Sequence, residues 1–488
     1  MLEQIRCGFR LLFLALSFRA VPAHADCLSP STALVSPFRQ AELDLDLGLD
    51  YDAGSLAGAA GYLLENWGSA PATCANLLLN RLFNVTAVVD SAGRPLRFSQ
   101  RVAVFDDDSS LQVLLLSVRL PRPVAGGRRI RLRVEYHGHL VGYTETGALY
   151  IRDRIDRDFT ILREDAYAFP VPGTLSWQLN RKIPLVDFAF HARIQVPADL
   201  TVATGGDLLS AKRVGDRAVF EYRSRRPVPF LNVAIAPYLQ LVHGPLHLSY
   251  FPQDSAGARR VADGVGRCLQ LFAGWFGPLG EEPQLTVIEI PEGWGSQASL
   301  TGGIIQEADA FRDSNGMQAV YHELAHLWDP PDEDRPSARV NEGLASYLQR
   351  RAAASLDGWT GMDSVMDARA ARLVERLGAE PRLQGIPLAR YGQEGITTLS
   401  YNVGMLLFYA LDRCVGRDAF NQRIGGFDSR YRDGGATLEK LRDELQSGDD
   451  RGVTALLDQW LFTTRWFARL RGGETIAQIA DSCAAERR

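Results

Sequence analysis

Lysine is almost absent from this sequence of 488 residues. Only Lys182, Lys212 and Lys440 occur, so nearly all of the 53 basic residues are arginines. Arginine in place of lysine along a whole chain is typical of a GC-rich genome, and by itself it marks no site. The formal net charge of −5 favours solubility and argues against a nucleic-acid partner.

Long apolar runs are also missing, and no stretch reaches the roughly 20 residues that a stable membrane span needs. A short apolar core does occur over residues 11–18. Arg6 and Arg10 precede it, and the small-x-small pattern Ala-His-Ala follows at 23–25. This arrangement predicts a secretory signal over residues 1–25, and therefore a secreted or periplasmic protein. An uncleaved N-terminal anchor is the alternative.

Cysteine is scarce, and none of the six cysteines lies in a C-x-x-C pair, which argues against a cysteine-based metal or redox motif. Five remain after the predicted cleavage. In an exported protein Cys27 could pair with Cys74, and Cys414 with Cys483 near the chain end. Cys268 would then be a free thiol, buried on a helix. The sequence does not fix the pairing, and all five could be free.

Only eight histidines occur, and two of them lie in the pattern H-E-L-A-H. His322 and His326 are four residues apart, so on a helix they project from the same face. Two imidazoles so placed, with Glu323 beside them, suit a tetrahedral zinc ion that keeps one open position. The alternative is an ordinary helix with surface His and Glu.

A catalytic zinc normally needs a third protein ligand. Glu342, in the stretch N-E-G-L-A-S-Y, is the best candidate, because a second helix running back against the first would bring its carboxylate to the metal. Zinc lowers the pKa of its bound water to roughly 7. Glu323 would accept the proton from that water and pass it to the leaving amine.

H-E-L-A-H followed by N-E-G-L-A-S-Y resembles the aminopeptidase N-like gluzincin zinc metallopeptidases, the family that includes leukotriene A4 hydrolase. The resemblance implies one Zn²⁺ per chain, held by His322, His326 and Glu342. The family places eighteen residues between its second His and its Glu, whereas fifteen lie between His326 and Glu342. We interpret the difference as a remodelled turn.

The stretch S-Y-N-V-G resembles the start of a family helix with the motif Y-x-K-G, whose Tyr donates a hydrogen bond to the oxyanion of the tetrahedral intermediate. Tyr401 matches that Tyr, Gly404 is retained, and Val403 replaces the Lys. The resemblance thus implies that Tyr401 stabilises the oxyanion. Packing of Tyr401 against the core is the alternative.

The family also has an edge strand with the motif G-x-M-E-N, whose Glu binds the substrate's N-terminal ammonium while its backbone pairs with the peptide. The resemblance places this motif at residues 302–306 (G-G-I-I-Q), so Gly302 and Gly303 would line the substrate and Ile305 would replace the Glu. Glu307, on the same side of the strand, could supply the carboxylate or be a solvated charge. Without an anchor, the activity would be that of an endopeptidase or a specialised exopeptidase.

The pattern along the chain predicts two domains of different class. Before residue 245 it alternates as in half-buried strands, for example over 111–120 and 129–136, and only 55–65 and 73–82 indicate short helices. Helical patterns dominate afterwards. The zinc helix itself is expected to start at a cap and to end at a proline pair, with Ser314 or Asn315 as the cap and Pro330-Pro331 as the end.

The fold class is therefore α+β, with a β-sheet saddle or sandwich followed by a thermolysin-like, mainly helical zinc metallopeptidase domain. The expected limits are 26–245 for the first domain, 246–470 for the second and 471–488 for a C-terminal tail. The large C-terminal helical domain of longer family members is absent from the sequence.

The sequence predicts an exported zinc metallopeptidase, aminopeptidase-like, that acts on a peptide or protein substrate. An endopeptidase and a non-catalytic zinc-containing binding protein are the alternatives. The intact Glu323 and Tyr401 argue against the second of these. The oligomeric state stays open.

Overall fold

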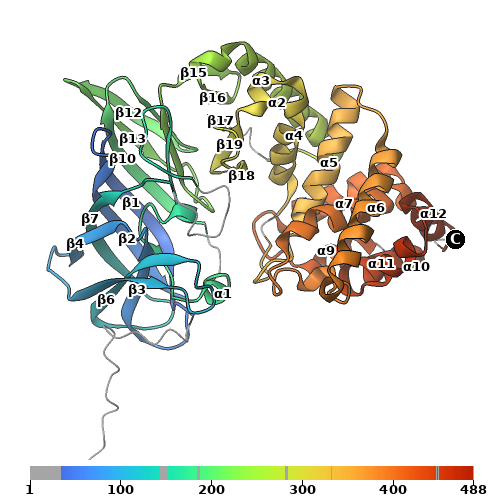
Figure 1. The fold of residues 1–488 in the computed structure, drawn as a ribbon, viewed down its shortest axis with the longest axis horizontal. Coiled ribbons are helices and arrows are strands. Elements are labelled where there is room, and N and C mark those ends of the chain that lie inside the picture. Colours follow the sequence, from blue (N-terminus) through green and yellow to red (C-terminus); the bar gives the residue numbers. More distant parts are fainter. Residues whose placement is uncertain are drawn as a thin grey trace, which may run out of the picture.

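The computed structural model describes residues 35–486, apart from 143–151, 184–186, 281–283, 300, 331, 447 and 449. The predicted signal over residues 1–25 lies outside this part. Two domains stand side by side in Figure 1, the first built of sheets and the second mainly of helices. The predicted α+β fold class is confirmed. None of the helices in the described ranges combines the length and the apolar character that crossing a membrane requires.

The first domain is built from strands and two short helical turns. Its elements are β1 (Phe38–Asp50), β2 (Ser55–Asn66), β3 (Ala72–Leu79), β4 (Phe83–Asp90), β5 (Phe98–Val104), β6 (Gln112–Val124), β7 (Arg129–His139), β8 (Thr160–Arg163), η1 (Glu164–Ala166), β9 (Val171–Pro172), α1 (Trp177–Asn180), β10 (Ala189–Pro197), β11 (Thr201–Ala203), β12 (Asp207–Val214), β13 (Arg217–Arg223) and β14 (Asn232–Ala236). They form a seven-stranded sheet in the order β12-β13-β10-β1-β2-β7-β4, and two smaller sheets, β5-β6-β3-β9 and β11-β14-β8.

Alternation of side chains places one face of the large sheet in a core. Leu43, Leu45 and Leu47 of β1 are buried, because successive side chains of a strand point to opposite faces. Asp46 on the other face pairs with Arg193 of β10 at 2.8 Å. This half-buried pattern is the one that the sequence predicts for most of the domain.

The two helices predicted at 55–65 and 73–82 are wrong. Residues 55–66 form β2, which pairs with β1 on one side and with β7 on the other. Residues 72–79 form β3, which pairs with β6 and β9. Their Ala- and Leu-rich composition suits a helix locally, but pairing on both sides outweighs that weak local preference.

The second domain combines one sheet with a set of helices. Its elements are β15 (Leu239–His243), β16 (Leu246–Tyr250), α2 (Ser255–Phe276), β17 (Leu285–Ile290), β18 (Gln297–Ser299), β19 (Gly303–Glu307), α3 (Asp309–Arg312), η3 (Ser314–Gly316), α4 (Met317–Ala325), η4 (His326–Trp328), α5 (Val340–Leu356), α6 (Met362–Ala379), α7 (Thr397–Val415), α8 (Arg417–Tyr431), α9 (Leu438–Gln446), α10 (Arg451–Leu457), a π-helical turn (Asp458–Phe462), α11 (Arg465–Arg471) and α12 (Ile476–Glu486). The sheet has the order β15-β16-β17-β19-β18, so β18 is an edge strand.

Both expected limits of the second domain shift in the structure. β15 precedes residue 245 but pairs with β16, so the sheet of the second domain begins at Leu239. The expected tail over 471–488 contains α12, which contacts α7 and α10. A disulfide between Cys414 of α7 and Cys483 of α12 fixes that contact and confirms the predicted pairing.

Of the other two cysteine predictions, one is confirmed and one stays a prediction. Cys268 is a free, buried thiol on α2, as predicted. Cys74 has no disulfide partner among the described residues. Cys27 lies outside them, so its pairing with Cys74 stays a prediction.

Two glycines allow α5 and α7 to cross at backbone contact. A Cβ placed on Gly343 of α5 would lie 2.4 Å from the Cα of Gly404 of α7, closer than real Cβ contacts come. The crossing lies one residue from Glu342 and three residues from Tyr401. The two glycines therefore set how closely these side chains approach one another.

We expect Gly343→Ala to lower the free energy of unfolding by roughly 1–3 kcal/mol, because an overpacked crossing must spread. Denaturant unfolding of the metal-free protein measures this change. Gly378→Ala on α6 is the matched control, since a Cβ there meets nothing within 4 Å. Alanine is the better helix former, so this control should raise stability by up to about 1 kcal/mol. Equal effects of the two variants would contradict a close crossing.

Candidate metal centre

The helix that carries the two histidines is anchored by its apolar face. Val320, Tyr321 and Leu324 of α4 are buried in the core of the second domain. At the end of η4, the indole N–H of Trp328 donates to the carbonyl of Gly277 at 2.8 Å. His322 and His326 are thereby held on the opposite, accessible side, as their spacing predicts.

This helix starts one or two residues later than predicted. Ser314 and Asn315 form the 3-10 turn η3, and no side chain caps α4, which begins at Met317. Asp313 caps η3 instead, since its carboxylate accepts from the amide of Asn315 at 3.0 Å. Three consecutive residues with turn-forming side chains allow either start, and the sequence does not separate them.

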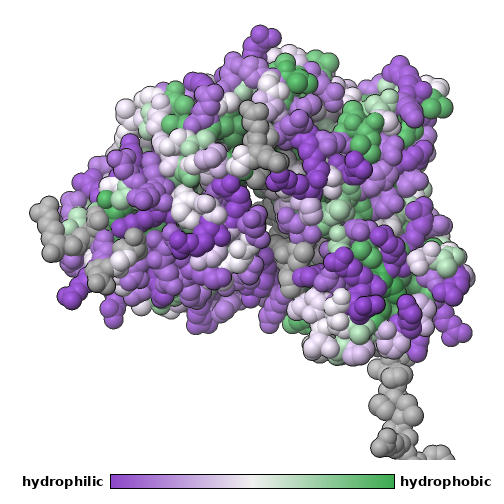
Figure 2. Space-filling view, turned by 180° about the vertical axis from the view of Figure 1, so that it is seen from behind, coloured by the Kyte–Doolittle hydropathy of each residue, from purple (hydrophilic) through white to green (hydrophobic). Residues whose placement is uncertain are grey.

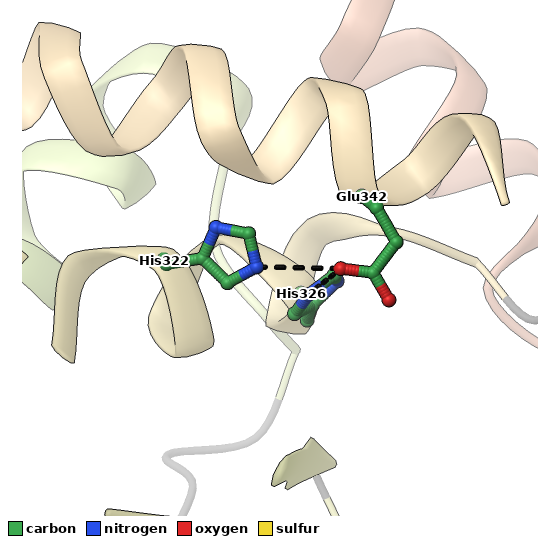
Figure 3. A group of neighbouring side chains, drawn as sticks. All are labelled: His322, His326 and Glu342. Carbon is green, nitrogen blue, oxygen red and sulfur yellow. Dashed lines mark hydrogen bonds and ion pairs between the residues drawn. The ribbon is translucent and has the colours of Figure 1, made fainter. Parts of the chain in front are cut away.

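The three predicted ligands converge. Figure 3 shows His322 and His326 on one side and Glu342, from the first turn of α5, on the other. Glu342 Oε2 lies 3.3 Å from His322 Nε2 and 3.5 Å from His326 Nε2, and both dashed lines end on this one oxygen. One donor atom from each residue lies within 4.8 Å of the other two. The short connection after His326 thus still brings Glu342 to both imidazoles.

These separations match the edges of a metal tetrahedron. With metal–ligand bonds of about 2.0–2.1 Å, two ligands of a tetrahedral zinc ion lie roughly 3.3–3.4 Å apart. Neutral imidazole and carboxylate are also the donors that zinc accepts in such sites. His322, His326 and Glu342 therefore fit one zinc ion, with a fourth position left to water or substrate.

A second set of polar groups orients the ligands. His326 Nδ1 lies 3.9 Å from Asp329 Oδ2, on the ring edge turned away from Glu342. Asn341 hydrogen-bonds Asp329 in turn. Arg339 donates to the other carboxylate oxygen of Glu342, Oε1, and so leaves Oε2 for the metal. Such outer partners fix the ring orientation and the basicity of metal ligands.

The charges of the site shift the pKa values of its ligands. Burial would raise the pKa of Glu342, but hydrogen bonds from His322 and His326 hold it well below its usual range. Burial lowers the pKa of His326, yet its contacts with Asp329 and Glu342 outweigh this and raise it to about 10. A metal ion competes with that proton.

Glu323 and Tyr401 border the same space. Glu323 is buried, and this burial raises the pKa of its carboxyl above the usual value. The nearby His322 and His326 lower the pKa, but burial outweighs them. Tyr401 lies with its ring parallel to that of His322, at 6.0 Å between centroids. Burial holds the pKa of Tyr401 well above the normal range, so its phenol keeps a proton to donate.

The strand assigned to the G-x-M-E-N position is wrong. β19, which holds residues 303–307, lies between β17 and β18 and has no free edge. Ile305 is 2% exposed and packs in a core with Ile288, Ile290 and Trp294, so it cannot face a substrate. β18 is the edge strand beside β19, and it contacts α4 and η4. Ala298 lies at the middle of β18.

The three residues predicted to bind substrate are placed as follows. Gly302 lies in the turn between β18 and β19, Gly303 is the first residue of β19, and both lie against Gly205 of the first domain. Glu307 accepts from the amide of Gly295 at 2.7 Å, which fixes the turn before β18. Its negative charge also helps to raise the pKa of Glu323. Contact of these three with a substrate stays a prediction.

Several polar residues near the centre went unnoticed in the sequence. Asp165 of η1 accepts from Gln297 of β18 at 3.1 Å, so the first domain contributes an acid beside the edge strand. Asp329 and Arg339 flank the ligands as described above. The only available signal for Asp329 and Arg339 was their position in the sequence, three residues from His326 and from Glu342.

Comparison with known proteins supports the fold. No protein-family profile matches the sequence. Leucine aminopeptidase 2 from Ajellomyces capsulatus (strain NAm1 / WU24) is 23% identical over 168 residues, which make up 31% of this chain. The match spans only 27% of that relative's length.

Solved structures match over nearly the whole chain. The M1 zinc metallopeptidase from Deinococcus radiodurans aligns with a TM-score of 0.63 at 21% identity, over 90% of this chain and 97% of that one. A variant from the same organism, bound to a Tyr-Ser-Ala substrate, gives 0.62 at 21% identity, over 88% and 95%. This chain has the M1 zinc metallopeptidase fold. The fold implied by the resemblance to aminopeptidase N-like gluzincins is thereby confirmed.

We expect Asp329→Asn to weaken zinc binding by about 10–100-fold, because the ring of His326 loses the charge that orients it. Competition with a chromophoric chelator measures the affinity. Asp367→Asn is the control, since Asp367 is an exposed acid on α6. If Asp329→Asn binds zinc as tightly as the wild-type protein does, an orienting role of Asp329 is contradicted.

Proposed function

We propose that this chain is a zinc-dependent peptidase of aminopeptidase type that hydrolyses peptide bonds of peptide or protein substrates. The observation that carries the proposal is the convergence of five groups. His322, His326 and Glu342 form a metal-binding set, and Glu323 and Tyr401 border the position that this set leaves open. The names of the similar proteins, a leucine aminopeptidase and M1 zinc metallopeptidases, support the same activity.

When bound, zinc supplies the Lewis acidity that makes water a nucleophile near neutral pH. Glu323 accepts the proton of the attacking water and delivers it to the leaving amine, a transfer that its raised pKa favours. Tyr401 donates its O–H to the oxyanion of the tetrahedral intermediate. Such a donor is worth roughly 3–4 kcal/mol in comparable sites.

Arg339 prepares Tyr401 and Glu342 for these roles. Its guanidinium donates to Glu342 Oε1 and lies 3.4 Å from the hydroxyl of Tyr401. Because the guanidinium donates a hydrogen bond to the phenol oxygen, the phenol hydrogen points away from Arg339. In the proposed mechanism it points towards the substrate carbonyl.

The edge strand β18 aligns the substrate in this proposal. Its outer edge has no partner strand among the described residues, and a peptide can pair with it through backbone hydrogen bonds. Ala298 offers no carboxylate for the substrate's ammonium. Asp165 accepts a hydrogen bond from Gln297 of β18, and Glu164 is its neighbour in the chain. In this proposal the two acids replace the missing anchor.

A cation beside this acidic pair would stabilise its charged form. Burial raises the pKa of Glu164 to about 8, and the adjacent Asp165 adds to the shift. No hydrogen bond reaches the Glu164 carboxyl from the residues that the structure describes. An ammonium group between the two side chains would relieve their repulsion.

We also propose that the protein is exported, to the periplasm or the medium. The predicted signal over residues 1–25 motivates this. The disulfide between Cys414 and Cys483 supports it, because such bonds persist in oxidising compartments. Endopeptidase action is the second candidate function, favoured by the missing carboxylate at Ala298.

One experiment tests the activity and its mode. A mixture of peptides, half with free and half with acetylated N-termini, is incubated with the zinc-loaded protein and read by mass spectrometry. We expect single residues to be lost from the free peptides alone. Glu323→Gln should keep its zinc and lose at least about 100-fold in rate.

The outcomes separate the candidates. Internal cleavage of both halves would replace the aminopeptidase proposal by an endopeptidase. Full activity of Glu323→Gln would remove Glu323 from the mechanism. No cleavage by a zinc-loaded wild-type protein would leave a zinc-containing binding protein as the better account.

A further inference from the structure

Arg181 of the first domain reaches the second domain beside the metal centre. It directly follows α1, which lies on the side of the first domain that faces the helices in Figure 1. Its Nη1 lies 3.9 Å from the position that a Cβ on Gly395 would take. Gly395 belongs to the loop before α7, the helix of Tyr401. The guanidinium therefore bridges the two domains near the candidate centre.

This guanidinium has no anionic partner within the described part of the chain. Arg181 is half-buried, and no hydrogen bond or ion pair of its side chain occurs there. A guanidinium carries five N–H donors that stay charged at all relevant pH values. A half-buried group of this kind with unused donors is ready to bind an anion.

A second positive charge near Arg181 makes the position still more favourable for an anion. Burial lowers the pKa of Arg181, and the positive charge of Arg339 lowers it further. Arg339 is itself at the centre, through its bonds to Glu342 and Tyr401, and its side chain is 41% exposed. The loop of Gly395 also packs against the segment before α5, because a Cβ on Gly392 would lie 2.1 Å from the carbonyl oxygen of Ser337. Arg181 contacts this loop, and Arg339 follows Ser337 by two residues, so two cations, one from each domain, flank the same loop beside the metal ligands.

We propose that Arg181 and Arg339 form a carboxylate-binding subsite for the substrate. Their planar forks match the two oxygens of a carboxylate, and one such group between them would cancel their repulsion. The inference rests on the proposed peptidase function. The carboxylate belongs either to the C-terminus of a short peptide or to an acidic side chain, and both present the same chemistry.

The position of the pair suits the far end of a bound peptide. In Figure 1 β18 and α1 lie at opposite ends of the space between the domains, with the helices of the metal ligands beside it. On the opposite face, in Figure 2, the side chains near the boundary between the domains are mostly hydrophilic. A peptide whose N-terminus lies at Asp165 and β18 would run past the metal towards Arg181. The subsite would then favour peptides of a few residues.

Four peptides of one sequence test the subsite. They are a free acid, its C-terminal amide, an amide with a Glu near the C-terminus, and the same amide with Gln in place of that Glu. The value of kcat/KM is measured for the wild type, for Arg181→Gln and for Lys182→Gln. Lys182 is the matched control, because it is the exposed cation next in the chain.

We expect the wild type to prefer the carboxylate peptides by roughly 10–100-fold, as for hydrogen bonds between charged groups. The preference should appear in KM. In Arg181→Gln the ratio between carboxylate and amide peptides should fall to near one, and in Lys182→Gln it should stay as in the wild type. Preference for the free acid alone would identify the C-terminus as the ligand, and preference for the Glu peptide would identify a side chain.

Two results would overturn the inference. The first is equal kcat/KM of the wild type for the carboxylate and the amide peptides. The second is a kcat/KM ratio in Arg181→Gln that equals the ratio of the wild type. Calorimetric binding of the same peptides to zinc-loaded Glu323→Gln gives an answer without turnover. If the wild type cleaves no peptide, the proposed function fails, while this binding measurement still decides on the subsite.

Discussion

One carboxylate oxygen joins the two halves of the metal centre. Glu342 Oε2 faces both His322 Nε2 and His326 Nε2, at 3.3 and 3.5 Å, and it comes from a different helix. This contact exists only where α5 approaches α4 in one register. The connection between the helices is shorter than in the family that the sequence resembles, yet it still satisfies this condition. The other features of the site follow from it, since Arg339 at the start of α5 is placed by the same approach and reaches Tyr401.

The two domains contribute different things to the proposed activity. The second domain carries the metal ligands, Glu323 and Tyr401, all on helices that are packed into one core. The first domain brings Asp165 to one end of the site and Arg181 to the other. In this account the helical domain performs the chemistry, and the β domain selects the substrate by its charged ends.

The local part of the site was predictable from the sequence, and the non-local part was not. His322 and His326 lie four residues apart, so their spacing alone fixes their common face, and Glu323 lies between them in the sequence. The edge strand was misplaced because strand order depends on pairing between distant segments, and Gly302-Gly303 imitates the start of the expected motif. β2 and β3 were misread for the same reason. Asp165 and Arg181 gain their meaning only from tertiary contacts, and no local pattern distinguishes them from the many other charged residues of the chain.

The most direct test of the central claim is a zinc titration of the metal-stripped protein, followed by the initial rate of peptide hydrolysis. The account predicts a negligible rate without zinc and a linear rise that ends at one equivalent per chain, because His322, His326 and Glu342 form one site. A rate that does not depend on zinc would contradict it. So would a protein that binds one equivalent and hydrolyses no peptide.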